Sequence, residues 1–273
     1  WFSKKYGECV FGKMMNVVEV MMEYGGMEHA AAIAIGVGQA KKDTVEAAGH
    51  ETAHHWFGDG IRIRHWGELW MSEGFTDYAT WRFFGQRDGD EAMYGYFDEA
   101  KRELAGQLRD GVTQPLDQKA SVDPEEGLSW VPYLQGAWML RMIECRIGTK
   151  PLDDLLRAWF QKKKGASVST TDFVAFAKER GHDFTGFFKA WKELKTIPTF
   201  DAQKSIDGSR VDVKLAPRGR VPEGITVPLR IVGKKGESKD VVVEPGKRLK
   251  IDVGFAVKSL VWDPERTVLC DVK

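Results

Sequence analysis

Two histidines four residues apart, His50 and His54, enclose Glu51 in the stretch VEAAGHETAHHWFGDG, in a chain that contains only six histidines. The stretch predicts a helix that begins near Asp43, a good N-cap residue, and ends before Gly58. Residues four apart lie on one face of a helix, so both imidazoles can reach one metal ion. The glutamate is turned by about 100° from the first histidine, which keeps it off the ion but close to it. The pattern therefore predicts a metal site on one helical face.

A catalytic zinc ion usually takes three protein ligands, so the two histidines need a partner. The candidate is Glu73, in the next predicted helix (LWMSEGFTDYATWRFF), behind a turn-rich connection that lets this helix fold back on the first. Two surface histidines on an amphipathic helix would give the same spacing without a metal. The predicted helix ends and the downstream acid favour the metal site.

The charge balance excludes several other functions. The 40 basic and 40 acidic residues cancel, so no overall field draws the chain to nucleic acid or to an anionic membrane. No apolar run approaches the roughly 18 residues that a membrane span needs.

The three cysteines form no metal or redox spacing. The remaining histidines near the motif and beyond it, His55, His65 and His182, also lack metal spacing, and we expect them in packing or at the surface.

The chain divides into a mixed first part and an all-β last part. Residues 16–22 and 30–37 are typical of strands on either side of the turn-like YGGMEH, and from about residue 91 to 195 the apolar spacing is mostly helical. After Pro198, short β-branched runs alternate with Gly or Pro turns, which indicates a small sandwich. We therefore predict an α+β fold with two domains. Residues 1–198 form a small mixed sheet and a mainly helical lobe, and residues 199–273 form a β-sandwich.

These motifs together resemble the gluzincin metallopeptidases of the aminopeptidase N type. HETAH is followed after eighteen residues by Glu73 in WMSEGFTDYA. HHWFGD and the upstream GGMEH resemble motifs that the family carries at the same positions relative to its zinc-binding histidines. VPYLQGAWMLRMI resembles the segment that carries the family's catalytic tyrosine, and DFVAFAKERGHDFTGFFKAWKELKTIPTF resembles the end of its helical half. The resemblance spans nearly all of residues 1–200. It implies a thermolysin-like catalytic domain with one zinc ion per chain, followed by the small β-domain that many members carry.

The resemblance also implies the catalytic roles. The two histidines of HETAH and Glu73 would bind zinc, with water in the fourth position. Glu51 would act as the general base that takes a proton from this water and passes it to the departing amine. Tyr133 matches the tyrosine whose hydroxyl stabilises the oxyanion, although Gln135 stands where the family usually has lysine.

The motif GGMEH carries the implied specificity. Glu28 aligns with the family glutamate that binds the α-amino group of the substrate, and Gly25 and Gly26 align with the edge strand beside the peptide. A carboxylate near the metal pairs well with an ammonium group and poorly with an acylated amine, which would direct cleavage to the first peptide bond. The asparagine that normally ends this motif is His29 here.

Asp77 lies four residues after Glu73 and therefore on the same helical face. It can accept a hydrogen bond from the outer nitrogen of a ligating histidine, as an aspartate at this offset does in thermolysin-like proteins. The alternative is an exposed acid of the helix.

Members of this family usually begin with a large β-domain that walls the active site, and we expect it to be missing because only some fifteen residues precede the first predicted strand. The leading hypothesis is a zinc-dependent aminopeptidase acting on peptides with a free N-terminus. One alternative is a thermolysin-like endopeptidase, since a cleft open on one side would admit longer peptides. Another is a catalytically dormant peptide-binding module. The sequence does not indicate the compartment, cytoplasmic or exported.

Overall fold

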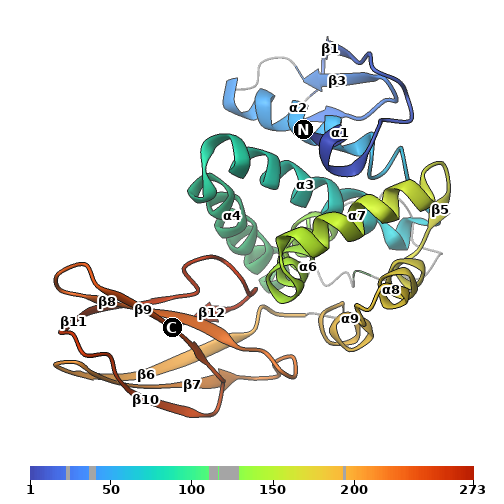
Figure 1. Cartoon of the computed structure of the whole chain (residues 1–273). Helices are drawn as coiled ribbons and strands as arrows, with labels where there is room; N and C mark the ends of the chain where they lie inside the picture. Colours follow the sequence, from blue (N-terminus) through green and yellow to red (C-terminus); the bar gives the residue numbers. More distant parts are fainter. Residues whose placement is uncertain (23–24, 37–40, 111–115, 117–128, 193–194) are drawn as a thin grey trace. The chain divides into compact units, whose positions relative to one another are not determined.

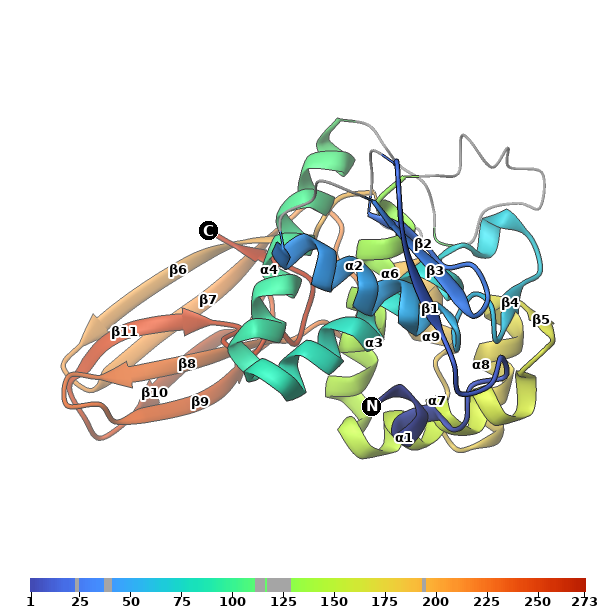
Figure 2. The ribbon, with the colours of Figure 1, turned by 90° about the horizontal axis from the view of Figure 1, so that it is seen from above.

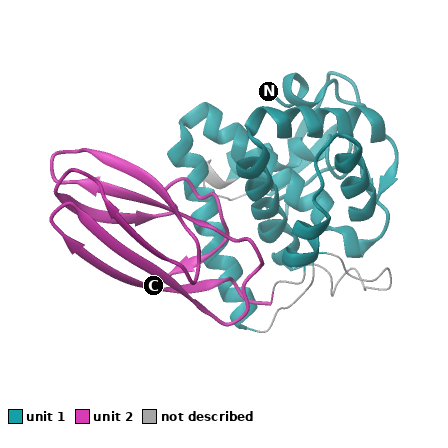
Figure 3. Cartoon of the chain, turned by 60° about the horizontal axis from the view of Figure 1, so that its bottom comes forward, with its two compact units in different colours: residues 1–193 teal, residues 194–273 magenta. Residues whose placement is uncertain are grey.

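The structure, a computed structural model, describes residues 1–22, 25–36, 41–110, 116, 129–192 and 195–273, with the backbone alone for residues 41–43. The chain forms two compact units, residues 1–193 and 194–273 (Figure 3). The first unit combines a small sheet with helices, whereas the described residues of the second contain strands and turns. The predicted α+β class is confirmed.

A three-stranded mixed sheet opens the first unit. Its middle strand β3 (Ala32–Gly36) runs parallel to β1 (Asn16–Val20) and antiparallel to β2 (Gly26–Met27). The isoleucines of β3 are buried, and α2 (Lys41–His54) packs against β3 (Figure 1) and against β2 (Figure 2). The sheet therefore supports one side of the helix that carries both histidines.

The helix α3 (Trp70–Asp88) lies at the centre of the first unit. Its first three turns are buried on all sides, because it packs against α2, α4 (Asp90–Arg109) and α6 (Val131–Ile147) (Figure 2). The axes of α3 and α6 come very close at Gly74 and Gly136, where a Cβ atom added to Gly74 would lie 2.5 Å from the Cα atom of Gly136. Side chains at this crossing would push the two helices apart.

Further helices and two short strands complete the first unit. Two short parallel strands, β4 and β5, join the segment before α3 to the segment before α8. A capping box formed by Ser169 and Asp172 starts α8. The elements are α1 (Phe2–Tyr6), β4 (Arg62–Ile63), η1 (Trp66–Glu68), α7 (Thr149–Lys163), β5 (Ser167–Val168), α8 (Thr170–Glu179) and α9 (Thr185–Trp191).

The second unit contains two sheets, with strand orders β10-β7-β6-β12 and β11-β8-β9. Every second residue is buried along β7 from Val211 to Leu215 and along β8 from Val227 to Ile231. This alternation shows that one face of each sheet lies in the core. The strands are β6 (Thr199–Asp207), β7 (Arg210–Arg218), β8 (Val227–Gly233), β9 (Ser238–Val243), β10 (Arg248–Asp252), β11 (Val257–Trp262) and β12 (Asp271–Val272).

Three details differ from the sequence-based expectation. Part of the turn-like GGMEH pairs with β3 as β2. β6 lacks the apolar alternation that predicts a strand, yet it pairs with β7 along its whole length, because backbone hydrogen bonds need no apolar side chains. α2 begins at Lys41, two residues before Asp43, whose side chain lies outside the described residues. The division into domains of residues 1–198 and 199–273 stays a prediction.

Candidate metal centre

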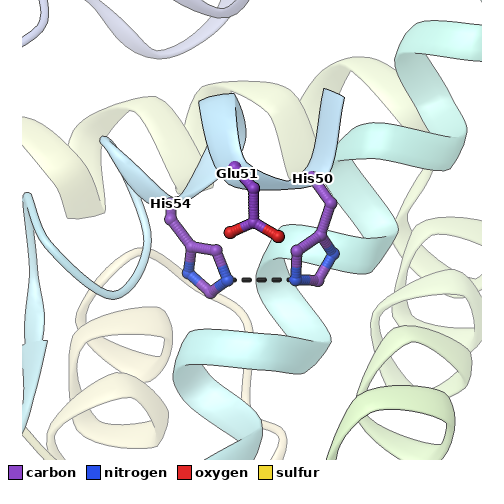
Figure 4. A group of neighbouring side chains, drawn as sticks. All are labelled: His50, Glu51 and His54. Carbon is purple, nitrogen blue, oxygen red and sulfur yellow. Dashed lines mark hydrogen bonds between the residues drawn. The ribbon is translucent and has the colours of Figure 1, made fainter. Parts of the chain in front are cut away.

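The last turns of α2 bring the two histidines of HETAH together. The Nε2 atoms of His50 and His54 are 3.0 Å apart, and the side chain of His54 is buried (Figure 4). Figure 4 shows the carboxylate of Glu51 between the two rings, on the same side of the helix. The ligand atoms of these three residues all lie within 4.8 Å of one another. The spacing of the motif therefore produces the shared face that the sequence predicts.

Glu73, in the first turn of α3, completes the group. Its Oε2 atom lies 3.4 Å from Nε2 of His50 and 3.2 Å from Nε2 of His54. The glutamate is buried, and Ser72 donates a hydrogen bond of 3.1 Å to its other oxygen, Oε1. We call His50, His54 and Glu73 the histidine cluster.

The outer ring nitrogens determine the tautomers in the histidine cluster. Nδ1 of His50 lies 2.8 Å from Oδ1 of Asp77, and Nδ1 of His54 lies 2.9 Å from the carbonyl oxygen of Phe57. A carboxylate and a carbonyl only accept hydrogen bonds, so both Nδ1 atoms carry the hydrogen. The two Nε2 atoms of the neutral rings are then lone-pair donors that point at each other and at the carboxylate of Glu73.

The donor set fits a bound cation. Three lone-pair donors that converge in this way repel one another unless positive charge lies between them. A tetrahedral zinc ion with bonds of about 2.0–2.1 Å holds its ligand atoms roughly 3.3 Å apart. The three separations of 3.0, 3.2 and 3.4 Å match this geometry. Two imidazoles and one carboxylate are also the protein ligands of one class of catalytic zinc site.

The pKa shifts within the histidine cluster also favour a bound cation. Burial opposes charge on His50, but the hydrogen bonds that the protonated ring donates to the carboxylates of Asp77 and Glu73 outweigh it and raise the pKa of His50 well above its usual range. Burial also opposes charge on Glu73, yet the neighbouring His54 and His50 hold the pKa of this glutamate well below its usual value. The cluster therefore attracts positive charge.

Glu51 and Tyr133 border the cluster. Burial raises the pKa of Glu51 to about 7, against the opposing effect of the two histidines. Burial first, and then the carboxylates of Glu73 and Asp77, raise the pKa of Tyr133, so its hydroxyl keeps its proton and can donate. The Tyr133 ring stacks on the ring of His50 with centroids 6.1 Å apart. A hydrogen-bond donor and a carboxyl group thus stand beside the same cluster.

The GGMEH segment lies along this group. Gly26 packs so closely that an added Cβ atom would lie 2.6 Å from Cγ of Glu51, and the carbonyl oxygen of Gly25 accepts a hydrogen bond of 3.1 Å from Gly36. A carboxylate oxygen of Glu28 lies within 4.8 Å of ligand atoms of both His54 and Glu73. All nine residues that the sequence analysis assigns to a site therefore lie in or beside one group.

Some contacts that shape the group have no motif in the sequence. The glycine pair at the crossing of α3 and α6 lies beside Glu73 on one helix and one turn beyond Tyr133 on the other, so it sets how closely their helices approach. The only sequence signal for this close approach was the glycine that ends each of the segments SEG and YLQG. Gln135, which departs from the family pattern, is fully buried and donates a hydrogen bond of 2.8 Å to the Trp191 carbonyl. Its amide therefore joins α6 to the end of α9.

Within the described part of the chain, every helix falls short of the length and apolar character that a bilayer span requires.

Comparison with known proteins gives a consistent result. A family model described as the peptidase family M1 domain matches residues 8–191. The probable aminopeptidase 2 of Sulfurisphaera tokodaii is 25% identical over 239 residues, which are 84% of this chain and 30% of that protein. The leucine aminopeptidase 2 of Eremothecium gossypii is 30% identical over 158 residues, 55% of this chain and 25% of the relative.

Solved structures share the fold. The aminopeptidase A of Legionella pneumophila, solved in complex with aspartic acid, covers 100% of this chain with a TM-score of 0.77 and 17% identity, while the match takes up 33% of that chain. The matches take up 30% and 25% of the length of the two curated relatives described above.

Proposed function

The chain belongs to peptidase family M1, and from this premise we propose that it acts as a zinc-dependent aminopeptidase, which hydrolyses the N-terminal peptide bond of peptides. The observation that carries the proposal is the convergence of three lone-pair donors, 3.0–3.4 Å apart, with Glu51 and Glu28 beside them. An ordinary protein core gains nothing from gathering these groups, because uncompensated buried charge costs free energy.

His50, His54 and Glu73 would hold the zinc ion. When bound, the ion supplies Lewis acidity, which lowers the pKa of water to about 7 and polarises a carbonyl oxygen. Asp77 and the Phe57 carbonyl keep both histidine rings in the tautomer that offers Nε2 to the ion. These two contacts therefore orient the histidine rings for a metal ion.

The proton transfers would fall to Glu51. Its carboxylate faces the same space as the two Nε2 atoms, so it can take a proton from the attacking water and deliver it to the departing amine (Figure 4). The hydroxyl of Tyr133, which keeps its proton, would donate a hydrogen bond to the oxyanion that develops on the scissile carbonyl.

Glu28 would select the free amino terminus. A carboxylate within 4.8 Å of the cluster atoms can pair with a substrate ammonium group only one residue from the scissile bond. The backbone at Gly25 and Gly26 would lie alongside the peptide. The partner is thus a peptide with a free N-terminus, and the wider substrate range depends on the whole protein.

The test compares a free peptide with its N-acetylated form, using the zinc-loaded chain. We expect the free peptide to be cleaved and the acetylated one to be cleaved far more slowly, and we expect Glu28→Gln to narrow this difference. Equal cleavage of both peptides by the wild type would instead indicate an endopeptidase. Zinc binding without any hydrolysis would indicate a peptide-binding module.

A further inference from the structure

The turn that carries Glu28 connects β2 to β3 and is held at both ends. Before Glu28, Gly26 lies directly against the Glu51 side chain. After it, Ala31 adopts a left-handed backbone conformation with φ of 61°, which is unusual for a residue other than glycine. A strained residue of this kind persists only when its surroundings hold it in place.

His55, the residue after the cluster histidine His54, supplies one of these contacts. The backbone N–H of Ala31 donates a hydrogen bond of 3.0 Å to Nε2 of His55. Nδ1 of the same ring lies 3.2 Å from the carbonyl oxygen of Glu51. His55 therefore connects the backbone of Glu51 to the turn that carries Glu28.

The partners leave one arrangement of hydrogens on this ring. Ala31 donates through its N–H, so Nε2 of His55 must be the acceptor, and Nδ1 must carry the hydrogen that it donates to Glu51. The ring is buried, and the Phe11 ring stands edge-on against it at 5.6 Å. His55 thus has the tautomer found in the cluster histidines, but its Nε2 points at the Ala31 backbone instead of at the cluster.

We propose that His55 is a positioning residue for amino-terminus recognition: it holds the turn through Ala31, so that Glu28 stands over the histidine cluster. The inference rests on the proposed aminopeptidase function, because Glu28 acquires its role there. His55 touches neither the ligand atoms nor the substrate in this scheme. Packing alone would require a flat ring of this size, but not an acceptor at Nε2.

Three substitutions separate these requirements. His55→Gln keeps an acceptor near the position of Nε2 but loses the donor to Glu51. His55→Asn keeps a group near Nδ1 and cannot reach Ala31. His55→Phe keeps the packing and removes both hydrogen bonds. If His55 acts through Ala31, the glutamine variant behaves like the wild type and the other two do not.

The experiment measures calorimetric binding of free L-leucine and of 4-methylpentanoate, which lacks the amino group, to the zinc-loaded full chain. The ratio of the two affinities isolates the contribution of the ammonium group. We expect His55→Gln to retain the ratio, and His55→Asn and His55→Phe to lower it roughly 5- to 10-fold, the effect of one hydrogen bond, with about one zinc per chain throughout. In peptide hydrolysis the same two variants should raise KM more than they lower kcat.

Equal ratios in the glutamine and asparagine variants would overturn the proposal. A second measurement needs no variant: the imidazole ¹⁵N shifts of His55 should report hydrogen on Nδ1 alone, and hydrogen on Nε2 would also overturn it. A wild type that prefers leucine but cleaves no peptide would refute the proposed hydrolysis and leave the role of His55 in amine binding standing.

Discussion

Two groups of buried and half-buried ionisable side chains lie on opposite sides of α3. Glu73 leaves the helix toward the histidine cluster, and Arg82, nine residues later at about 100° per residue, leaves it on the opposite side. There Arg82 and Arg141 each donate a hydrogen bond of 2.6 Å to Glu144, and Arg82 also lies 3.5 Å from Asp153. We call Arg82, Arg141, Glu144 and Asp153 the arginine cluster.

The two clusters differ in whether their charges are matched. In the arginine cluster each carboxylate faces a guanidinium, so the group is electrostatically complete. In the histidine cluster the neutral rings and the carboxylate of Glu73 are all acceptors, so the group needs a proton or a metal ion as its positive charge. Buried charge that is paired supports the architecture, whereas buried charge that lacks its counterpart indicates a binding site. This difference predicts which substitutions alter activity and which alter stability.

The largest expected effect concerns Glu51. Glu51→Gln removes the proton acceptor and should lower kcat by about 10³- to 10⁴-fold, while the chain keeps about one zinc ion. Hydrolysis of a panel of aminoacyl-anilides, together with the metal content, measures both. Glu103→Gln, an exposed glutamate of α4, is the matched control. A zinc-loaded Glu51→Gln protein with wild-type activity would remove Glu51 from its role.

The arginine cluster should respond through stability. Glu144→Gln leaves two buried guanidinium groups with one carboxylate fewer, which should lower the free energy of unfolding by about 3–5 kcal/mol. Chemical denaturation measures this change. Asp154→Asn, which breaks the exposed pair with Lys150, should cost less than about 1 kcal/mol. Similar losses in both variants would mean that burial does not distinguish the two pairs.

Tyr133→Phe removes the donor beside the cluster and keeps the ring that stacks on His50. We expect kcat to fall by about 10²- to 10³-fold with KM little changed, because the hydrogen bond forms in the transition state. Steady-state kinetics separate the two constants. Tyr96→Phe, which removes a hydrogen bond of 2.7 Å to Glu46, should leave kcat unaltered. A rise in KM with kcat unchanged would place Tyr133 in substrate binding instead.

The smallest expected effect concerns Asp77. Asp77→Ala removes the acceptor that orients His50 and should weaken zinc binding by about 10- to 100-fold, whereas Asp77→Asn, which retains an acceptor atom, should weaken it less. Competition with a chelator of known affinity gives both values. Wild-type zinc affinity in the alanine variant would show that the contact between Asp77 and His50 is not needed for zinc binding.

Sequence patterns predict well the features that depend on the spacing of neighbouring residues. The spacing of HETAH determines that two imidazoles share a helical face, and the acid in WMSEGF lies on the next helix, as predicted. The α+β class follows from the change from helical spacing to short β-branched runs. The strand β6 was not predicted from the sequence, because its pairing depends on the neighbouring strand β7 and not on its own side chains.

The sequence by itself determined which groups this protein offers: two histidines and a glutamate at helical spacing, a downstream acid, a tyrosine and the GGMEH carboxylate. Local periodicity is enough for this, since it sets the direction in which neighbouring side chains leave one helix. Only the tertiary structure decided that three helices and the turn after β2 bring these groups together around one centre. The Phe57 carbonyl and the Ala31 N–H are backbone atoms without any sequence signature, and the Gly74–Gly136 crossing joins segments far apart in the chain. Such contacts depend on long-range packing, which no local sequence pattern encodes.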